Sequence, residues 1–136
     1  MAGIAGRKTI LVVEDNLDLQ RAIKVRLASK GYRVVTAADA VFAVSMALHE
    51  KPDVILLDIG LPGGDGFLVM QRLRDLSEMD GIPVILITAR EPSINRKRAA
   101  DEHAFAYFQK PFNDDELLAS IESAVGGKRL PSGLEN

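Results

Sequence analysis

One stretch decides the fold of this chain: Asp53-Val54-Ile55-Leu56-Leu57-Asp58-Ile59-Gly60-Leu61-Pro62. Four apolar residues run without interruption into a carboxylate, and a loop with glycine and proline follows at once. A short continuous apolar run is typical of a strand that is buried on both faces, as in a parallel sheet. We therefore expect Asp58 to stand at the carboxyl end of a central strand, the edge of open α/β sheets where ligands bind.

Similar apolar runs occur on both sides of this stretch and alternate with helical patterns. The predicted strands cover residues 9–13, 32–37, 54–58, 82–87 and 104–109. The predicted helices cover about residues 17–29, 39–50, 67–76, 93–101 and 113–126, with N-caps at Asp15 or Asn16, Asp39, Asp65 and Asn113. This alternation implies a doubly wound parallel (βα)₅ sheet with helices on both faces, a three-layer sandwich. In the second helix, we expect Val41, Val44, Ser45 and Leu48 to face inward.

The composition excludes several classes of protein. The chain has 136 residues and no cysteine, so disulfides and cysteine-built metal sites are ruled out, which suits a cytoplasmic protein. The net charge of −2 is too small to predict binding to nucleic acid, and the apolar runs are too short to cross a membrane. We expect one domain over residues 8–125, a flexible N-terminal arm over 1–7, and a C-terminal tail or truncated linker over 126–136.

Polar residues follow four of the predicted strands: Glu14 and Asp15, Asp58, Thr88, and Lys110. Because the carboxyl ends of parallel strands share one edge, these side chains should converge there. Three carboxylates in a small space repel one another unless one is protonated or a cation binds. Oxygen ligands favour Mg²⁺ or Ca²⁺ over zinc, and so few protein ligands favour Mg²⁺, which keeps waters and shares phosphate oxygens. An aspartate in such a site can act as a nucleophile towards phosphorus.

The motifs at these strand ends resemble those of the receiver domain of bacterial two-component response regulators. They are Val13-Glu14-Asp15-Asn16, Asp58-Ile59-Gly60-Leu61-Pro62-Gly63-Gly64-Asp65-Gly66, Thr88-Ala89 and Lys110-Pro111-Phe112. Each motif is weak by itself, but their order and separations together are specific. The resemblance covers about residues 8 to 125 and implies a flavodoxin-like fold with strand order 2-1-3-4-5.

The resemblance also implies a role for each residue of the site. Asp58 would accept a phosphoryl group from a sensor histidine kinase, a histidine phosphotransfer protein or a small phosphodonor. Asp15, Asp58 and the backbone carbonyl of Gly60 would bind Mg²⁺ directly, and Glu14 would bind it through water. Thr88 and Lys110 would contact the phosphoryl group. Phosphorylation and dephosphorylation would be self-catalysed, so the chain would not be a turnover enzyme.

A second set of implied features concerns the output of the domain. Tyr107 matches the switch aromatic of the family, although packing in a static core is an equally good interpretation of this residue. The surface of the fourth helix, fifth strand and fifth helix would change partners, and a homodimer through this surface is one candidate. The first helix, with Arg21, Lys24 and Arg26, would dock the kinase. The Lys110-Pro111 bond resembles one that is cis in the family, and we expect no direct contact with nucleic acid or membrane.

The sequence departs from the family pattern in two places. His103-Ala104-Phe105-Ala106 replaces the usual Gly-Ala-Asp-Asp, which makes the output surface more apolar. Gly60 and Arg90 occupy positions that tune hydrolysis of the acyl phosphate in the family. Because Gly60 has no side chain to orient a water, we expect the phosphorylated form to lose its phosphate slowly.

Other functions remain open from the residues alone. Asp58 could simply cap a turn. A phosphohydrolase with an aspartate nucleophile usually carries an Asp-x-Asp pair, but Gly60 stands at the second position. A nucleotide- or flavin-binding module would need a glycine-rich loop after the first strand, where Glu14-Asp15 would repel phosphate. A degenerate receiver that serves only as an interaction platform would not need the intact acidic set, Thr88 and Lys110.

Overall fold

Five parallel strands form the middle layer of the structure, a computed structural model that describes residues 7–61, 66–77, 81–89 and 92–126. The strands are β1 (Thr9–Val13), β2 (Arg33–Ala37), β3 (Val54–Asp58), β4 (Val84–Thr88) and β5 (Ala106–Gln109). They lie in the order β2-β1-β3-β4-β5, and every neighbouring pair is parallel. This confirms the predicted strand order and places β3 at the centre of the sheet.

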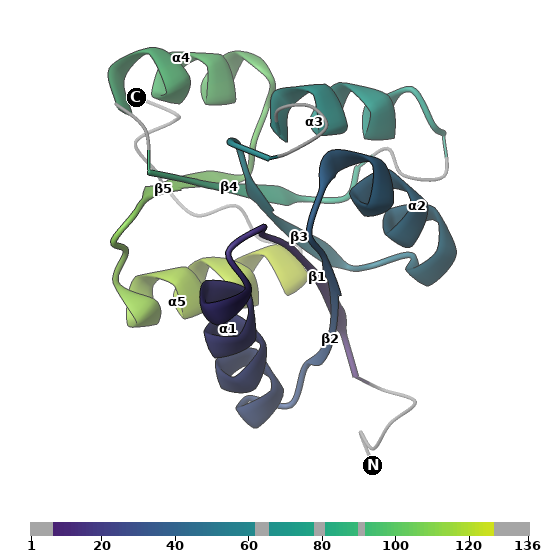
Figure 1. The fold of residues 1–136 in the computed structure, drawn as a ribbon, viewed down its shortest axis with the longest axis vertical. Helices are drawn as coiled ribbons and strands as arrows, with labels where there is room; N and C mark the ends of the chain where they lie inside the picture. Colours follow the sequence, from purple (N-terminus) through teal and green to yellow (C-terminus); the bar gives the residue numbers. More distant parts are fainter. Residues whose placement is uncertain (1–6, 62–65, 78–80, 90–91, 127–136) are drawn as a thin grey trace.

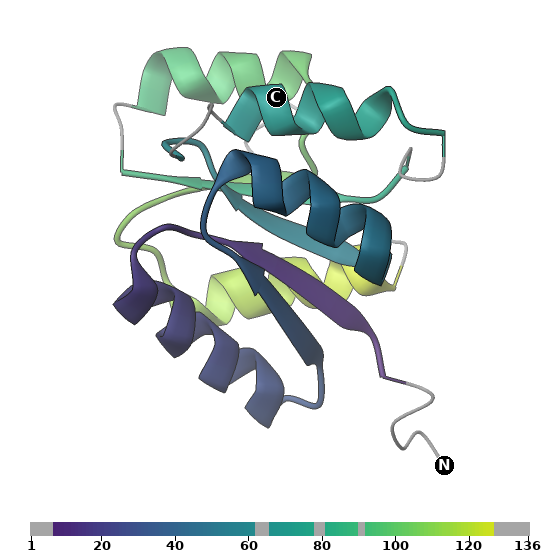
Figure 2. The same cartoon turned by 45° about the vertical axis from the view of Figure 1, so that its right-hand side comes forward.

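Five helices cover the two faces of the sheet (Figures 1 and 2). Helices α1 (Leu17–Ser29) and α5 (Asp114–Val125) lie on one face. Helices α2 (Ala40–Glu50), α3 (Gly66–Arg74) and α4 (Pro92–Asp101) lie on the other. The flavodoxin-like three-layer sandwich is therefore confirmed.

Alternate strand residues build two separate cores, because successive side chains of a strand point to opposite faces. Leu11, Ile55 and Leu86 belong to the core under α2, α3 and α4. Their neighbours Ile10, Leu56 and Ile85 belong to the core under α1 and α5. All six side chains are at most 1% exposed, so the central strands are buried on both faces as the continuous apolar runs predicted.

Three predicted N-caps are present, and each accepts a hydrogen bond from the third residue of its helix. Asn16 Oδ1 accepts from Leu19 N (3.0 Å), Asp39 Oδ1 from Phe42 N (2.7 Å) and Asn113 Oδ1 from Glu116 N (3.0 Å). Such caps satisfy backbone N–H groups that have no partner within the helix. Since Asn16 caps α1, the Asp15 carboxylate is left for another role. The predicted cap Asp65 lies outside the described residues.

The predicted inner face of α2 is wrong. Ala40, Ala43 and Ala47 are buried, whereas Val41 is 64% exposed and Leu48 is 37% exposed. Ser45 is also exposed, and Val44 is only partly buried. The helix is apolar nearly all round, so its pattern does not select one face, and the small alanines allow the helix backbone to lie closest to the sheet.

Smaller differences concern the ends of elements. Residues 32, 82–83 and 104–105 lie outside the strands that were predicted to include them. The Lys110-Pro111 bond is cis, as expected. Residues 1–6 and 127–136 lie outside the described part of the chain, so the predicted arm and tail are not addressed. None of the helices in the described ranges is long and apolar enough to cross a membrane.

Candidate functional site

Glu14 and Asp15 follow directly after β1, where hydrogen bonds hold the backbone. Glu14 N donates to Ala37 O at the end of β2 (3.0 Å), which extends the pairing of the two strands by one residue. The Glu14 side chain turns inward and is only 3% exposed, and its Oε2 accepts from Asn16 N (3.0 Å). Asp15 is exposed at the rim. The two carboxylates therefore occupy different environments although they are adjacent in sequence.

Asp58 is the last residue of β3 and is 7% exposed. Its Oδ1 accepts from Gly60 N (3.0 Å), so the loop that follows β3 holds one carboxylate oxygen. The backbone next to it is fixed as well, because Ile59 N donates to Ile87 O (3.1 Å) and Gly66 N donates to Ile59 O (2.8 Å). The backbone N–H of Gly60 thus contacts the predicted site, while binding of a metal by its carbonyl stays a prediction.

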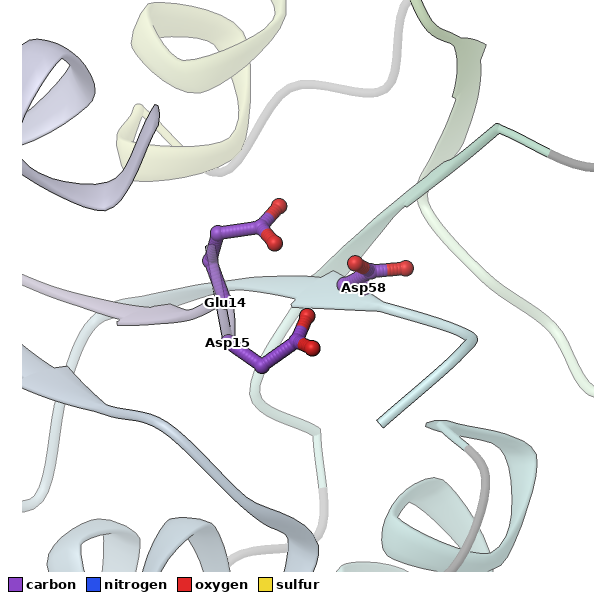
Figure 3. Close-up of side chains that lie close together, drawn as sticks. All are labelled: Glu14, Asp15 and Asp58. Atoms are coloured by element: carbon purple, nitrogen blue, oxygen red, sulfur yellow. The ribbon is translucent and has the colours of Figure 1, made fainter. Parts of the chain in front are cut away.

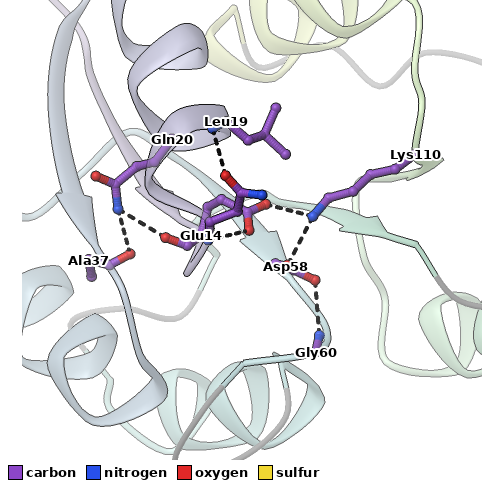
Figure 4. A network of polar contacts seen from close by, with 8 residues as sticks. Glu14, Leu19, Gln20, Ala37, Asp58, Gly60 and Lys110 are labelled. Carbon is purple, nitrogen blue, oxygen red and sulfur yellow. Dashed lines mark hydrogen bonds and ion pairs between the residues drawn. The ribbon is translucent and has the colours of Figure 1, made fainter.

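Lys110 comes from the opposite side of the site, directly after β5. Its backbone N–H donates to Thr88 O (2.7 Å), which ties it to the end of β4. Its Nζ lies 2.8 Å from Glu14 Oε1 and 3.1 Å from Asp58 Oδ2, so one ammonium joins carboxylates from two other strand ends (Figure 4). Thr88 is fully buried at the end of β4, and its contact with a phosphoryl group stays a prediction.

The three carboxylates form one cluster. Each of Glu14, Asp15 and Asp58 offers an oxygen, and these oxygens lie within 4.8 Å of one another (Figure 3). Hard oxygen donors of this kind suit Mg²⁺ or Ca²⁺ rather than a transition metal with nitrogen or sulfur ligands. The donor set therefore fits a small divalent cation.

Burial of the cluster perturbs its ionisation. Burial raises the pKa of Glu14 above its ordinary value of 4.5, and the negative charge of Asp58 acts in the same direction. Lys110 and the N–H of Asn16 oppose this rise. Burial also acts to lower the pKa of Lys110, but its hydrogen bonds to Glu14 and Asp58 outweigh it, so that pKa lies above 10.5. The protein thus keeps Lys110 protonated, while burial makes ionisation of Glu14 costly.

Two further predicted residues lie apart from this cluster. Tyr107 is 7% exposed and packs in the core under α2, α3 and α4. An inward aromatic fits both interpretations, switch and core filling, so its role as a switch stays a prediction. Arg90, the other position expected to tune hydrolysis, lies outside the described residues.

Two residues that shape the site were missed at the level of sequence. Gln20, on α1, donates from Nε2 to Glu14 O (3.0 Å) and Ala37 O (3.3 Å). A Cβ on Gly66 would lie 2.8 Å from Asp58 O and 2.9 Å from Ile59 Cα, so any other residue at the start of α3 would force the backbone beside Asp58 to shift. The cluster of glycines after Asp58 was a usable signal for Gly66, whereas no local pattern indicates where the Gln20 side chain points.

Comparison with known proteins identifies the family. The sequence matches the family described as response regulator receiver domain over residues 10–122. The chain belongs to this family. The receiver domain is 36% identical over 126 residues to the transcriptional regulatory protein KdpE of Mycobacterium tuberculosis, a match that covers 93% of this chain and 54% of KdpE. It thus spans about half the length of that relative.

Solved receiver domains share the fold. That of the sensor histidine kinase PA1611 from Pseudomonas aeruginosa, which has a magnesium ion in its active site cleft, has a TM-score of 0.81 and 33% identity, over 88% of this chain and 98% of that one. The BeF₃-activated receiver domain of RstA from Klebsiella pneumoniae has a TM-score of 0.79 and 30% identity, over 86% and 97%. In the present chain, the cluster of Glu14, Asp15 and Asp58 lies at the carboxyl edge of the sheet, where the sequence predicted the site.

Proposed function

We propose that this receiver domain accepts a phosphoryl group on Asp58 and thereby switches a surface for partner binding. The supporting observation is the convergence at one sheet edge of Asp58, two further carboxylates and the ammonium of Lys110. The donor would be a phosphohistidine of a sensor histidine kinase or histidine phosphotransfer protein, or a small phosphodonor. The domain acts as a phosphoacceptor and not as a turnover enzyme.

The proposed transfer is an in-line displacement at phosphorus. One carboxylate oxygen of Asp58 forms the new P–O bond while the bond from phosphorus to the donor breaks, and the leaving group takes the electron pair of that bond. Asp58, Asp15 and the Gly60 carbonyl would hold Mg²⁺, with Glu14 bound through water, and the ion supplies positive charge for the phosphoryl oxygens. Lys110 adds a second fixed positive charge, and the Thr88 hydroxyl donates to a phosphoryl oxygen.

The response would be a shift between two states of the domain. When Asp58 is phosphorylated, Thr88 moves towards the phosphoryl group, and Tyr107 occupies the space that Thr88 leaves. The surface formed by α4, β5 and α5 then changes partners, a homodimer among them. Such a switch is a change of population that one local charge biases.

The kinase would dock beside α1. An apolar groove lies between α1 and α5, lined among others by Leu19, Ala22, Phe112 and Leu118. An ion pair between Arg26 Nη2 and Asp114 Oδ2 (2.9 Å) borders it, and α1 also carries the exposed apolar residues Leu17 and Val25. Apolar contact area with basic residues around it suits a helical partner.

The decisive experiment measures phosphate incorporation with Mg²⁺ and acetyl phosphate. We expect one phosphate per chain, none in Asp58→Asn, and normal incorporation in Asp53→Asn, which changes the same residue type at the other end of the β3 stretch. Repeated turnover of acetyl phosphate would instead identify a hydrolase. If no phosphate is incorporated, the nucleotide-binding and platform hypotheses take the place of this proposal.

A further inference from the structure

The side chain of Gln20 links the ends of two strands at the site. Gln20 lies in the first turns of α1, and its Nε2 donates to Glu14 O (3.0 Å) after β1 and to Ala37 O (3.3 Å) at the end of β2 (Figure 4). Both partners are carbonyl oxygens, so only the NH₂ end of the amide can satisfy them. One side chain therefore orients two backbone carbonyls that come from different strands.

The Glu14 carbonyl belongs to the peptide that joins the two acidic residues. Because a peptide unit is planar, fixing the direction of this carbonyl also fixes the direction in which the chain enters Asp15. Glu14 N is held in turn by Ala37 O (3.0 Å), the same oxygen that Gln20 contacts. The backbone of Glu14 is thus anchored on both sides, and Gln20 supplies the anchor nearer to Asp15.

Asp15 depends on this anchor more than Glu14 or Asp58 does. The buried Glu14 side chain is held by Lys110 and by Asn16 N, and Asp58 is held by Lys110 and by Gly60 N. Asp15 is exposed, so packing restricts its side chain little. The position of its carboxylate relative to the other two is therefore decided mainly by its backbone.

We propose that Gln20 is a positioning residue for the cation site, which sets the Glu14-Asp15 turn so that the Asp15 carboxylate faces those of Glu14 and Asp58. This inference rests on the Mg²⁺ binding proposed above. Groups that orient metal ligands without touching the metal typically contribute tenfold or more to metal affinity. Gln20 orients its ligand through the backbone.

The test compares two glutamine substitutions of equal chemistry. Gln20→Met keeps the length and approximate volume of the side chain but removes the NH₂ donors. Gln71→Met is the control, since the Gln71 amide on α3 contacts Glu102 (3.4 Å) and no residue of the site. Binding is measured by NMR titration of the full chain with MgCl₂, and thermal unfolding is measured in EDTA for each protein.

We expect Gln20→Met to raise the Mg²⁺ dissociation constant about tenfold and Gln71→Met to leave it unchanged. If Gln20 serves only to attach α1 to the sheet, Gln20→Met lowers the unfolding temperature but binds Mg²⁺ as the wild type does, and the inference is overturned. A wild-type protein that binds no Mg²⁺ overturns this inference and the proposed metal site together.

A shorter amide keeps the test decisive if Gln20→Met does not fold. Gln20→Asn retains the NH₂ group but is one methylene too short to reach both carbonyls. We expect it also to weaken Mg²⁺ binding, by less than Gln20→Met would. Wild-type affinity in folded Gln20→Asn contradicts the inference.

Discussion

Charged side chains are paired differently at the two ends of the sheet. At the amino end, Thr9 N donates to Asp53 Oδ2 and Asp53 N donates to Thr9 O, both at 2.8 Å, and Arg33 pairs with Glu50. At the carboxyl end, three carboxylates converge, and among the described residues the ammonium of Lys110 pairs with two of them. At the amino end each of the two carboxylates has a partner of its own, whereas at the carboxyl end the buried Glu14 and Asp58 share one ammonium.

As a result, ionisation of a carboxylate has opposite effects on stability at the two ends. Glu50 has its pKa lowered, chiefly by its hydrogen bond to Arg33, so ionisation of Glu50 favours the folded state. Glu14 has its pKa raised, chiefly by burial, so ionisation of Glu14 opposes folding. Local costs of this kind are common at functional sites. The proposed Mg²⁺ would offset the negative charge of this cluster and, with Lys110, supply the positive charge that a phosphoryl group needs.

Removal of the cation at each end gives the largest expected contrast. Lys110→Met leaves Glu14 and Asp58 buried without their ammonium. It should lower the free energy of unfolding by about 3 kcal/mol. This is the low end of the range for a broken buried ion pair, because Lys110 is 21% exposed. Arg33→Met should cost clearly less, because Arg33 is 45% exposed and Glu50, at 18%, keeps more contact with water than the 3% exposed Glu14. Urea denaturation in EDTA measures both, and equal losses would contradict the contrast. Phosphorylation should fail only in Lys110→Met.

Magnesium should stabilise the carboxyl end specifically. At a concentration of 100 times its dissociation constant, Mg²⁺ should raise the unfolding free energy by about 2.7 kcal/mol. Asp15→Asn should lose most of this gain, because it removes one charged ligand, while Asp53→Asn at the amino end should keep it. Thermal unfolding with MgCl₂ and with EDTA checks both variants. A full Mg²⁺ gain in Asp15→Asn would exclude Asp15 as a ligand.

Two glycines test how closely each end is packed. Gly66→Ala would place a Cβ against the backbone of Asp58 and Ile59, and it should cost about 2 kcal/mol and slow phosphorylation by acetyl phosphate. Gly31, before β2, has φ +95° and no atom within 4 Å of a new Cβ. Gly31→Ala should therefore cost about 1 kcal/mol through backbone strain alone and leave phosphorylation unchanged. Normal phosphorylation in Gly66→Ala would show that Asp58 tolerates a shift of its backbone.

The pH dependence of stability should have opposite signs at the two ends. The raised pKa of Glu14 means that wild type loses stability relative to Glu14→Gln as pH rises from the ordinary value of 4.5 through the higher folded value. The lowered pKa of Glu50 means that the contribution of Glu50 to the free energy of unfolding is present above pH 4.5. This contribution is lost as the pH falls through the lower pKa of the folded state. Urea denaturation at several pH values, in EDTA, measures how the contributions of Glu14 and Glu50 to the free energy of unfolding change with pH. Parallel curves would refute this assignment.

The smallest expected effect concerns the lifetime of the phosphorylated state. Gly60 presents its N–H to Asp58 but has no side chain that could orient a water. Gly60→Asn should therefore speed the release of phosphate severalfold after loading with acetyl phosphate, without changing the amount first incorporated. Release of phosphate is followed over time in both proteins. Equal decay rates would show that the missing side chain does not limit hydrolysis.

Much of the site was predictable because its residues follow strands that unbroken apolar runs identify in the sequence. Glu14, Asp58, Thr88 and Lys110 each stand at a strand end, and parallel strands bring such ends together whatever the loops do. The caps Asn16, Asp39 and Asn113 were equally predictable, since a cap contacts only its own helix. Prediction failed for α2, because a helix that is apolar nearly all round has no continuous polar face that would show its orientation.

By itself, the sequence determined the alternation of strands and helices, the strand ends that carry the chemistry, and the family to which the chain belongs. These features depend on local periodicity and on residues close together in the chain. Only the tertiary structure decided that alanines of α2 face the sheet, that Gln20 reaches two strand ends, and that α3 begins against the backbone of Asp58. Each of these depends on how closely distant segments approach one another, and that distance is decided by packing of the whole core rather than by any local pattern.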